Sequence, residues 1–344
     1  METILIPGGM GFIGSHTAVA LIQNGYQVII LDDLSNSSPS VLDGIEQITA
    51  TRPVFYEGDA ADKQTLDRIF SAHRIDAVIH FAGFKAVGES KAAPLSYYCN
   101  NLNTTMALLD AMSRYAVKRL VFSSSATVYD SLQYTVLTEA TPRTCQSPYG
   151  WTKYMSEQII SDFCAATPGT GAVLLRYFNP VGAHESGLIG ERPQGVPQNL
   201  MPYITQVAIG QREKLSVFGG DYDTPDGTGV RDYIHVSDLA HGHVLALQYS
   251  RAHAHCVPFN LGSGKGYSVL ELVKAFEEAT GVFIPYEITG RRPGDVGIYY
   301  ADTAHARETL GFTAVRSLAD MCRSAYRWEQ HVKRLSSHEC AVTS

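Results

Sequence analysis

The sequence predicts an α/β fold, in which a doubly wound parallel sheet is followed by a smaller C-terminal α/β domain. Through the first half of the chain, short apolar runs alternate with amphipathic stretches of helical length. The apolar runs are mostly continuous, as expected for parallel strands that helices cover on both faces. After residue 179 the pattern changes, because Gly, Pro, Asn and Asp become frequent and long periodicity is lost until residue 236.

The first half contains candidate strands separated by candidate helices. The strands are expected at Thr3–Ile6, Gln27–Leu31, Pro53–Glu57, Ala77–Phe81, Arg119–Ser123 and Ala172–Arg176. The helices are expected at Ser15–Asn24, Lys63–His73, Asn103–Tyr115 and Tyr149–Ala165. Strands joined through helices form right-handed βαβ units, so the carboxyl ends of these strands should meet at one edge of the sheet.

The second half is expected to fold differently. Residues 179–229 should form loops and short elements that shape a pocket. Helices are expected at Val236–Leu247, Ser268–Thr280 and Ser317–Val332, and the small, polar residues 336–344 are expected to form a frayed tail. The sequence therefore predicts a first domain at 1–179 and a second at 180–335, with some of the chain crossing back to the first.

Composition and charge argue against several classes of function. The 344 residues carry a formal net charge of -7, which disfavours an extended nucleic-acid surface. The six cysteines form no C-x-x-C pair and no His/Cys cluster with zinc spacing, so we expect reduced thiols, a cytoplasmic protein and no metal site. The sequence shows no secretory signal pattern, and no run of about 20 apolar residues predicts a membrane span.

A glycine-rich turn joins the first strand to the first helix. Gly8, Gly11 and Gly14 follow G-x-x-G-x-x-G spacing. The first two glycines let the backbone turn sharply and approach a pyrophosphate, and the third lets the helix pack closely on the strand. The free N–H groups at the start of that helix attract phosphate. A glycine-rich turn without a ligand is the alternative, and residues at the next strand ends argue against it.

The second strand ends in Asp32 and Asp33, near the spacing expected for a carboxylate that binds the adenosine ribose. Such a carboxylate accepts bonds from the ribose hydroxyls and repels a 2′-phosphate, so NAD is predicted rather than NADP. Asp59 follows the third strand, where it either binds the adenine amine or caps a loop. At the end of the fourth strand, room for the cofactor is left by Phe81, Ala82 and Gly83. The first domain is therefore predicted to be an NAD-binding Rossmann domain.

Tyr149 and Lys153 form a Tyr-x-x-x-Lys pattern on a predicted helix, where positions i and i+4 share a face. An unperturbed tyrosine has a pKa of about 10, but a neighbouring Lys cation and an oxidised nicotinamide both favour the phenolate and should lower that pKa toward neutrality. Ser125 follows the fifth strand, where it either caps a turn or shares the proton of a substrate hydroxyl. Each feature alone is common, but their order along the chain is the one a doubly wound domain requires.

Together these motifs resemble the extended short-chain dehydrogenase/reductase family, whose members act on sugar nucleotides. The resemblance runs from Ile4 to Trp328 and is closest to the members that invert carbon 4 of a UDP-hexose. It rests on the segments HFAGFKAVGES from His80, SSSATVY from Ser123, RYFNPVGAH from Arg176, NLMPY from Asn199 and DGTGVRDYIHV from Asp226. It also implies a homodimer.

The resemblance implies that Tyr149 is the catalytic base, Lys153 its partner and Ser125 the assisting hydroxyl. The NAD site that it implies comprises Gly8, Gly11, Phe12, Ile13, Gly14, Asp32, Asp33, Asn36, Ser37, Asp59, Ala60, Phe81, Ala82, Gly83, Lys85, Asn100, Ser123, Tyr149, Lys153, Tyr177 and Phe178. The implied UDP-sugar site comprises Lys85, Ser125, Thr127, Tyr149, Phe178, Asn179, Asn199, Leu200, Phe218, Arg231, Arg292, Asp295 and Tyr299.

Three of these positions carry a specific expectation. Arg231 and Arg292 offer forked donors that suit pyrophosphate oxygens. Tyr299 matches a position beside the 2-substituent of the sugar, where its bulk should disfavour an N-acetyl group.

Pro7 departs from the family, in which Thr commonly precedes the first glycine, and so removes a hydroxyl and an N–H from the turn.

The resemblance implies an enzyme of galactose metabolism that interconverts UDP-glucose and UDP-galactose. Tyr149 would take the C4 hydroxyl proton while C4 gives hydride to NAD, and hydride would return to the opposite face of the 4-keto sugar. One alternative is a related NAD-dependent dehydratase or decarboxylase, but the dehydratase pattern has Asp-Glu after the threonine of the serine strand, where this sequence has Val128 after Thr127. The other is a non-catalytic NAD-binding regulator, and such proteins typically lack the tyrosine or the lysine.

Overall fold

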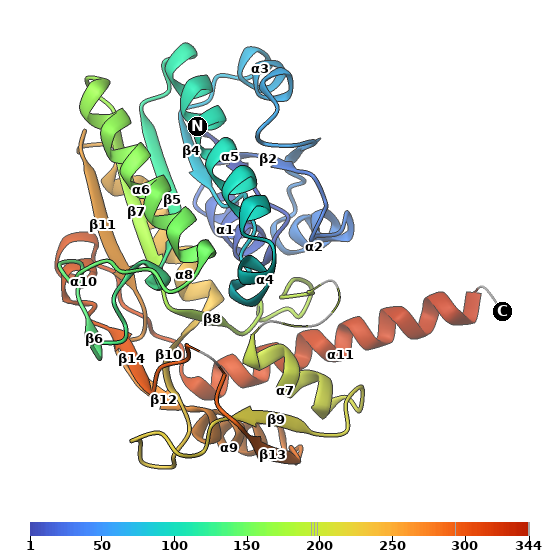
Figure 1. Cartoon of the computed structure of the whole chain (residues 1–344). Coiled ribbons are helices and arrows are strands. Elements are labelled where there is room, and N and C mark those ends of the chain that lie inside the picture. Colours follow the sequence, from blue (N-terminus) through green and yellow to red (C-terminus); the bar gives the residue numbers. More distant parts are fainter. Residues whose placement is uncertain (194, 196, 198, 293, 343–344) are drawn as a thin grey trace.

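A seven-stranded parallel sheet forms the framework of the first half, in the order β11-β7-β5-β4-β1-β2-β3 (Figure 1). The strands are β1 Thr3–Pro7, β2 Gln27–Asp32, β3 Val54–Glu57, β4 Ala77–His80, β5 Arg119–Ser125, β7 Gly171–Tyr177 and β11 Cys256–Leu261. The computed structural model describes residues 1–193, 195, 197, 199–292 and 294–342, with side chains through residue 335. The arrangement confirms the predicted doubly wound α/β fold.

Every strand predicted in the first half is present, and each end differs from the prediction by at most a few residues. The sequence analysis did not predict β11, which comes from the second half and pairs with β7 at the edge of the sheet. Pro258 lies in β11, and a proline is tolerated there because one side of an edge strand needs no donor. The first sheet therefore depends on chain from both halves.

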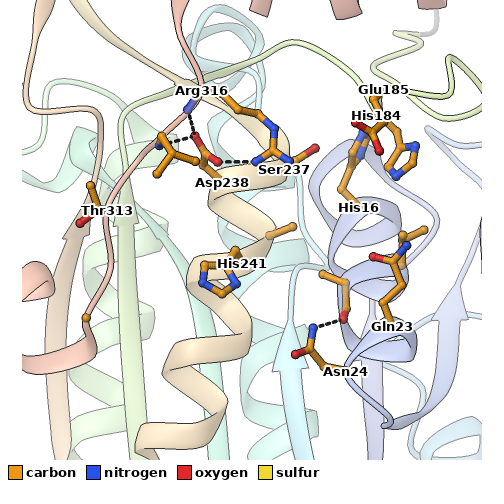
Figure 2. A pocket seen from close by; sticks show the side chains of 15 residues that line it. His16, Gln23, Asn24, His184, Glu185, Ser237, Asp238, His241, Thr313 and Arg316 are labelled. Carbon is orange, nitrogen blue, oxygen red and sulfur yellow. Dashed lines mark hydrogen bonds and ion pairs between the residues drawn. The ribbon is translucent and has the colours of Figure 1, made fainter. Parts of the chain in front are cut away.

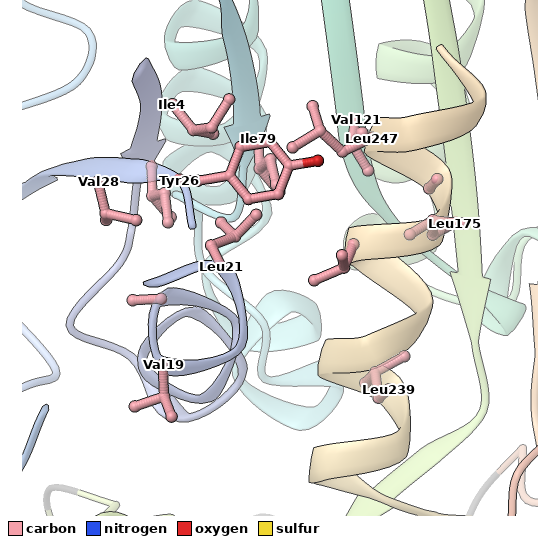
Figure 3. Close-up of a cluster of buried hydrophobic side chains, with 14 of the residues drawn as sticks. Ile4, Val19, Leu21, Tyr26, Val28, Ile79, Val121, Leu175, Leu239 and Leu247 are labelled. Carbon is pink, nitrogen blue, oxygen red and sulfur yellow. The ribbon is translucent and has the colours of Figure 1, made fainter. Parts of the chain in front are cut away.

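Helices cover both faces of this sheet. One face packs against α1 (Phe12–Gln23), α8 (Val236–Tyr249) and α10 (Ala304–Leu310), and Figure 3 shows part of that apolar core around Leu21, Tyr26 and Leu247. The other face packs against α3 (Lys63–Ala72), α5 (Pro94–Arg114) and α6 (Pro148–Ala166). The inner strands β1, β4 and β7 are fully buried because both faces are covered, which explains their continuous apolar sequences. Two further helices of this half are α2 (Ser40–Thr49) and α4 (Val87–Ala92).

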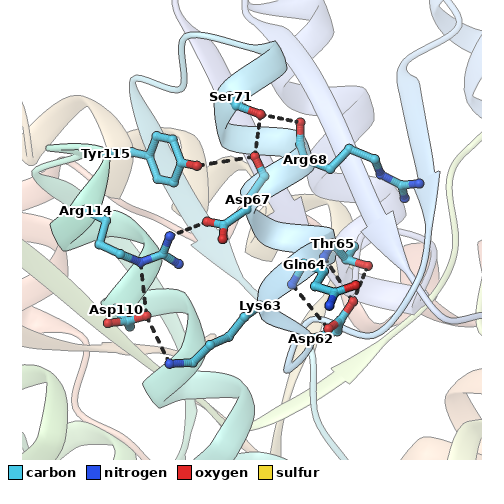
Figure 4. Close-up of polar contacts among 10 residues, drawn as sticks. All are labelled: Asp62, Lys63, Gln64, Thr65, Asp67, Arg68, Ser71, Asp110, Arg114 and Tyr115. Carbon is cyan, nitrogen blue, oxygen red and sulfur yellow. Dashed lines mark hydrogen bonds and ion pairs between the residues drawn. The ribbon is translucent and has the colours of Figure 1, made fainter.

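Polar contacts join α3 to α5 at the surface (Figure 4). Asp62 caps α3 by accepting hydrogen bonds from two backbone N–H groups of its first turn. Arg114, at the end of α5, pairs with Asp67 of α3 and with Asp110 one turn earlier. Because these ion pairs are well exposed to solvent, they orient the two helices more than they stabilise them.

The second half of the chain, together with one short strand from the first half, forms two small sheets. One has the order β12-β10-β14-β6, with β8 paired to β10, and the other pairs β13 with β9. The strands are β6 Val136–Leu137, β8 Asn179–Val181, β9 Leu215–Phe218, β10 Val230–His235, β12 Gly266–Ser268, β13 Tyr286–Thr289 and β14 Ile298–Ala301. The remaining helices are η1 Ala126–Val128, α7 Leu200–Ala208, α9 Val269–Thr280 and α11 Leu318–Val342. A separate apolar core lies between α7, α9 and α11.

The C-terminal helix departs from the prediction. It was expected to end at Val332 and to be followed by a frayed tail, but α11 continues to Val342 and extends away from the body of the molecule in Figure 1. The physical reason is that its sequence contains neither Gly nor Pro to end the helix. Within the part of the chain that the structure describes, no helix is long and apolar enough to cross a membrane.

Candidate active site

The glycine turn lies between β1 and α1. Gly8 has a φ of +78°, and a Cβ there would lie 2.5 Å from the backbone nitrogen of Ala82. A Cβ on Gly14 would lie 2.4 Å from the Gly8 oxygen, so both positions require glycine for close packing. Gly11 meets nothing nearer than 3.4 Å, and it precedes α1 without a side-chain cap. The N-terminus of α1 is thus left open for a phosphate group, which fits a dinucleotide.

Asp32, at the end of β2, ties this turn to the next loop. Its carboxylate accepts hydrogen bonds from the Met10 N–H at 3.0 Å, from the Leu34 N–H at 3.0 Å and from the Ser37 hydroxyl at 2.8 Å. Burial raises the pKa of Asp32. The structure therefore places two of the predicted cofactor residues, Asp32 and Ser37, in contact beside the glycine turn.

The other two acidic candidates cap loops. The Asp33 carboxylate accepts hydrogen bonds from the backbone N–H and the hydroxyl of Ser35, at 2.9 and 2.6 Å. The Asp59 carboxylate accepts one from the Ala61 N–H at 2.7 Å. Asp59 thus caps a loop, one of the two roles expected for it, through one oxygen of its carboxylate.

The loop after β4 is fixed by an asparagine that the sequence analysis missed. Phe81 and Ala82 donate their N–H groups to the carbonyl of Pro7, so Pro7 still serves this turn through its oxygen. The buried Asn101 accepts a hydrogen bond from the Phe84 N–H at 2.7 Å and donates to the Phe84 carbonyl at 3.0 Å. Its amide also donates to Thr152 on α6 at 2.9 Å. Only its neighbour, Asn100, was predicted as a site residue, and Asn100 donates to Asn101 at 3.1 Å.

Tyr149 and Lys153 lie near the start of α6, facing the end of β5. Ser147 caps the helix by accepting a hydrogen bond from the Gly150 N–H, and Pro148 occupies its first turn. The Lys153 side chain is buried, and its Nζ donates to the Ser123 carbonyl at 2.8 Å. That Nζ lies 5.9 Å from the centre of the Tyr149 ring. Tyr149 and Lys153 thus share one face of α6, as the spacing predicts, and Ser123 lies beside Lys153.

The protein's own groups do not lower the pKa of Tyr149, and the effect of a nicotinamide, on which the expected acidification also depends, stays a prediction. Burial raises the pKa of Tyr149 to about 12, while a hydrogen bond with Ser125 acts in the opposite direction. The Lys153 amine is directed to the Ser123 carbonyl, and burial lowers its own pKa to about 8. The phenol is therefore protonated at neutral pH until something else favours the phenolate.

Ser125 has both of the roles that the sequence suggests: it caps a turn and it interacts with Tyr149. It precedes η1, where its hydroxyl accepts hydrogen bonds from the Thr127 N–H at 3.2 Å and from the Thr127 hydroxyl at 3.0 Å. A serine hydroxyl that accepts two hydrogen bonds still has one proton to donate. The contact with Tyr149 therefore makes Ser125 a donor toward the phenolic oxygen, which is what an assisting hydroxyl requires.

A buried ionic network supports this side of the site, and the sequence analysis did not predict it. Glu157, one helical turn beyond Lys153, accepts hydrogen bonds from the Ser124 hydroxyl at 2.5 Å and from the Arg176 guanidinium at 2.8 and 2.6 Å. Arg176 also donates to the hydroxyl of Tyr129 at 2.9 Å. The sequence contained one sign of this network, because Arg176 is a charged residue in a predicted apolar strand.

Three of the residues predicted for the UDP-sugar, Asn179, Arg231 and Tyr299, lie on β8, β10 and β14. The side-chain oxygen of Asn179 is buried without a hydrogen-bond partner among the residues that the structure describes. An unpaired buried acceptor is costly, so this atom fits a ligand that donates a hydrogen bond. Nearby, the ring of Tyr299 lies 6.1 Å from that of Phe178, and the Arg231 guanidinium lies 4.7 Å from the Tyr299 ring.

The two predicted pyrophosphate donors are held differently. Arg231 pairs with Asp295 and donates to the carbonyls of Val230 and Val296, both at 2.8 Å, and of Gly297 at 3.2 Å. The fork predicted for phosphate oxygens thus binds protein acceptors in this conformation. Arg292 is exposed and lies 4.0 Å from the ring of Phe218. It remains the more accessible of the two arginines.

Glu191 is a second residue that the sequence analysis missed. Its carboxylate accepts hydrogen bonds from Lys85 at 2.9 Å and from Asn199 at 2.8 Å, which are two predicted site residues. Leu200 follows Asn199 as the first residue of α7.

Tyr177, at the end of β7, donates to or accepts from the ring of His243 at 2.9 Å. Within the part of the chain that the structure describes, no cluster of three or more His, Cys, Asp or Glu could hold a metal ion.

A parallel sheet of this strand order, with a Tyr–Lys pair on the helix after β5, defines a nucleotide-dependent enzyme of the extended short-chain dehydrogenase/reductase class. The sequence model of the GDP-mannose 4,6 dehydratase family matches residues 5–325. The chain is 53% identical to the UDP-glucose 4-epimerase of Bacillus subtilis over 95% of its own length and 96% of that protein. It is 51% identical to that of Mus musculus, over 96% and 97%. The chain belongs to the UDP-glucose 4-epimerase family.

Solved structures agree with this assignment. The UDP-glucose 4-epimerase of Stenotrophomonas maltophila, with bound NAD and formylated UDP-arabinopyranose, is 48% identical and superimposes with a TM-score of 0.95, over 97% of this chain and 100% of that one. The Bifidobacterium longum enzyme in complex with NAD+ and UDP is 50% identical, with a TM-score of 0.92 over 96% and 98%. The dehydratase alternative lacks its carboxylates here, because η1 consists of Ala126, Thr127 and the buried Val128.

Proposed function

We propose that this chain interconverts UDP-glucose and UDP-galactose in galactose metabolism, with NAD as its cofactor. The observation that carries the proposal is the meeting of Tyr149, Ser125 and Lys153 at the carboxyl end of β5, in a chain of the UDP-glucose 4-epimerase family. Ligands of open α/β sheets lie at this edge. The proposed reaction inverts carbon 4 of the hexose and consumes no external reductant.

In this proposal the protein's own residues move and hold one proton. Tyr149 exchanges it with the C4 hydroxyl of the sugar, and Ser125 shares it through the hydrogen bond to the phenol. When bound, NAD supplies a reversible two-electron oxidation at C4, and its positive charge favours the phenolate. Lys153, fixed on the Ser123 carbonyl, adds a cation to the same wall of the site.

The two ligands are assigned to two sets of residues. We assign NAD to the open N-terminus of α1, with Asp32 at the adenosine ribose, because both face the same end of the sheet. We assign the UDP-sugar to the side of β8 and β14, where the unpaired oxygen of Asn179 supports a bound donor. Arg231 would exchange part of its contact with Asp295 for a pyrophosphate oxygen, since both terminal nitrogens of its guanidinium bind protein acceptors in this conformation.

The remaining assignments concern the whole chain. We propose an NAD-binding domain at 1–179, a UDP-sugar domain at 180–335 from which β11, α8 and α10 cross back to the first sheet, and a homodimer in the cytoplasm. Large apolar side chains exposed on α5 and α6, namely Leu95, Met106 and Met155, support a partner on these helices. The five described cysteines are all free thiols, in keeping with a reducing compartment. Light scattering of the purified chain would test the dimer, and a monomer would contradict it.

The direct test of the proposed function is to incubate the purified chain with UDP-galactose alone. We expect UDP-glucose to form without added reductant, because the oxidation at C4 is reversed within each turnover. Separation of the two sugar nucleotides by chromatography measures the conversion. Release of a dehydrated or decarboxylated sugar nucleotide would instead support the related dehydratase or decarboxylase classes. Absence of any conversion would support a non-catalytic NAD-binding regulator.

A further inference from the structure

Two cysteines from the two halves of the chain meet at the edge of the seven-stranded sheet. Cys164 lies near the end of α6, and Cys256 is the first residue of β11. The helix and the strand are in contact (Figure 1), and both side chains pack against the apolar core that α6 shares with the sheet. The two thiols form a hydrogen bond with each other. The fold therefore joins two thiols that are far apart in the sequence.

The spacing of residues on α6 explains why Cys164 faces the sheet. Lys153, Glu157, Ile160 and Cys164 follow one another at intervals of four, three and four residues, which places them on one face of the helix. The first three are buried, whereas Cys164, near the end of the helix, is partly exposed. Met155, which supports the proposed partner contact, lies on the other side of α6 by helical spacing. A partner on that side would leave the thiol pair accessible.

The two thiols of the pair differ in acidity. Cys256 donates its S–H to the sulfur of Cys164, which lowers the pKa of Cys164, and the same hydrogen bond together with burial raises the pKa of Cys256. Because the thiolate is the nucleophile, Cys164 is the thiol that reacts first. Burial raises the pKa of Cys145 and of Cys322 to about 12, so these two thiols stay protonated.

Small molecules can reach the pair from the side of the sheet that α6 covers. Both thiols are partly exposed, and both belong to the core on this side. A cavity of about 470 Å³ lies on the opposite side, between α1 and α8 (Figure 2). Among the described residues that line this cavity there is no cysteine. An oxidant therefore meets the pair directly from solvent and not through that cavity.

We propose that Cys164 and Cys256 are a redox-sensitive pair, which a peroxide converts into a disulfide that ties α6 to β11. The Cys164 thiolate attacks one oxygen of hydrogen peroxide and forms a sulfenic acid, while the other oxygen leaves as hydroxide and takes up the thiol proton to give water. The Cys256 sulfur then attacks the sulfenic sulfur, so an S–S bond forms, the S–O bond breaks, and the hydroxyl leaves with the Cys256 proton as water. Two thiols thus lose two electrons in total, and one peroxide is reduced to two water molecules.

The disulfide would be reversible and would act on stability. Exchange with a small thiol such as glutathione restores both cysteines, as in the transient, redox-sensing disulfides of reducing compartments. The bond closes a long loop of chain, from residue 164 to residue 256, and so restricts the unfolded state. We expect the unfolding equilibrium constant of the oxidised chain to be lower than that of the reduced chain by a factor on the order of 10².

The first experiment treats the full-length chain, with any NAD that it retains, with a small excess of hydrogen peroxide at pH 7. The remaining thiols are blocked with iodoacetamide, and the peptides are mapped by mass spectrometry without reduction. We expect the peptides of Cys164 and Cys256 to be linked, and dithiothreitol to separate them. Cys99, an exposed thiol on α5, is the internal control and should oxidise more slowly. A sulfinic acid on Cys164 with Cys256 still alkylated would overturn the proposal.

Variants test the order of the two steps. In Cys256→Ser the second thiol is absent, so the sulfenic acid of Cys164 should accumulate and be trapped by dimedone. In Cys164→Ser, dimedone should not label Cys256. Labelling of Cys256 at the wild-type rate of peroxide consumption would contradict the assigned nucleophile. Circular dichroism confirms that both variants fold, and the linked peptides of the unmodified chain decide the proposal if one of them does not.

Unfolding in urea tests the effect of the bond. Peroxide should raise the midpoint of the wild type and of Cys99→Ser, the matched control, but not that of Cys164→Ser or Cys256→Ser. Equal midpoints of the oxidised and reduced wild type would show that the disulfide does not tie α6 to β11. A shift that persists in Cys164→Ser would assign the effect to another thiol. None of these measurements uses the turnover of a sugar nucleotide, so this inference and the proposed function fail independently.

Discussion

Tyr149 lies in surroundings that oppose its proposed role as a base. Burial stabilises the neutral phenol, since a charge in a medium of low polarity is costly. Ser125 offsets this effect in part by donating a hydrogen bond toward the phenolic oxygen. A phenol that stays protonated in the free chain and becomes a base only beside a cationic ligand would limit proton transfer to the assembled complex.

At this residue we predict the effect of Tyr149→Phe. The change removes the proton-transfer group but keeps the ring, so kcat should fall by about 10²–10⁴-fold, the usual contribution of general acid–base catalysis. NAD binding should persist, because the glycine turn and Asp32 are untouched. Tyr154→Phe is the matched control, since Tyr154 lies on the same helix but packs against Trp151 and Arg143. A Tyr149 variant with unchanged turnover would refute the assignment of the base.

A second residue-scale prediction concerns the shape of the sugar pocket. Tyr299 packs against Phe178 and Arg231, so its ring is held in place and cannot easily make room for a larger substituent. We expect the wild-type chain to turn over UDP-N-acetylglucosamine poorly and Tyr299→Ser to raise that activity relative to UDP-glucose. The ratio of kcat/KM for the two substrates measures the change. Near-equal turnover of both substrates by the wild type would contradict this role.

Local motifs predicted some of the site residues, but their supports could not be read from the sequence. The Tyr149–Lys153 pair follows from helical spacing alone, and the structure places it as expected. Asn101 and Glu191 act through contacts with residues far along the chain, such as Thr152 and Lys85. Nothing in a single sequence shows that those residues meet. The burial that raises the pKa of Tyr149 could not be read from the helical spacing either.

At the scale of elements, α6 joins the proton-transfer pair to a buried ionic network. Lys153 and Glu157 lie one turn apart on the same buried face, and Glu157 pairs with Arg176 from β7. Arg143 adds a weaker contact at 3.3 Å. The helix is therefore fixed on the sheet by charge as well as by apolar packing, which should hold Lys153 against the Ser123 carbonyl.

We predict that Glu157→Gln destabilises the chain by about 3–5 kcal/mol, because it leaves the Arg176 charge buried without its partner. The free energy of unfolding in urea measures the loss. Glu278→Gln is the matched control, since Glu278 forms an exposed ion pair with Lys274 at 3.8 Å, and such pairs contribute at most about 1 kcal/mol. Equal losses in the two variants would show that the network does not stabilise α6.

Apolar patterns predicted the buried strands well and the elements of the second half less well. Continuous runs such as Arg119–Ser123 predict strands because helices cover both faces of a parallel sheet. α7 was not predicted, since Pro202 lies in its first turn and the segment around it is rich in loop-forming residues. β11 contains Pro258, a residue that sequence patterns associate with loops. For both α7 and β11, packing against the rest of the molecule decided the secondary structure.

At the scale of the whole molecule, the two halves are not independent. β11 completes the first sheet beside β7, and α8 from the second half packs on α1 from the first. Asn260, on β11, donates to the carbonyl of Leu137 at 2.8 Å and accepts from Tyr129 at 2.6 Å, both in the segment after β5. The proposed ligand-binding edge is therefore built by chain from both halves, and we expect the molecule to unfold as one unit.

Buried histidines make the stability of that unit sensitive to acid, and the pKa values of four of them are strongly lowered. Burial lowers the pKa of His16 and His80 to about 3, and of His235 and His243 to about 4. In the unfolded chain a histidine has a pKa of about 6.5, so between these values the unfolded state binds the extra protons. Stability is fully present above pH 6.5 and should fall as the pH drops, by up to about 1.4 kcal/mol per pH unit for each such histidine.

We therefore predict that the urea midpoint falls between pH 7 and pH 5. His80→Gln separates this effect from the titration of carboxylates, because glutamine can keep a hydrogen bond to Thr105 but cannot gain a proton on unfolding. The free energy of unfolding of this variant should depend less steeply on pH than that of the wild type. The difference between the two slopes should equal the contribution of one histidine. His255→Gln, at an exposed site, should follow the wild-type slope. Parallel slopes for all three proteins would mean that His80 titrates alike in the folded and unfolded states, against the burial seen here.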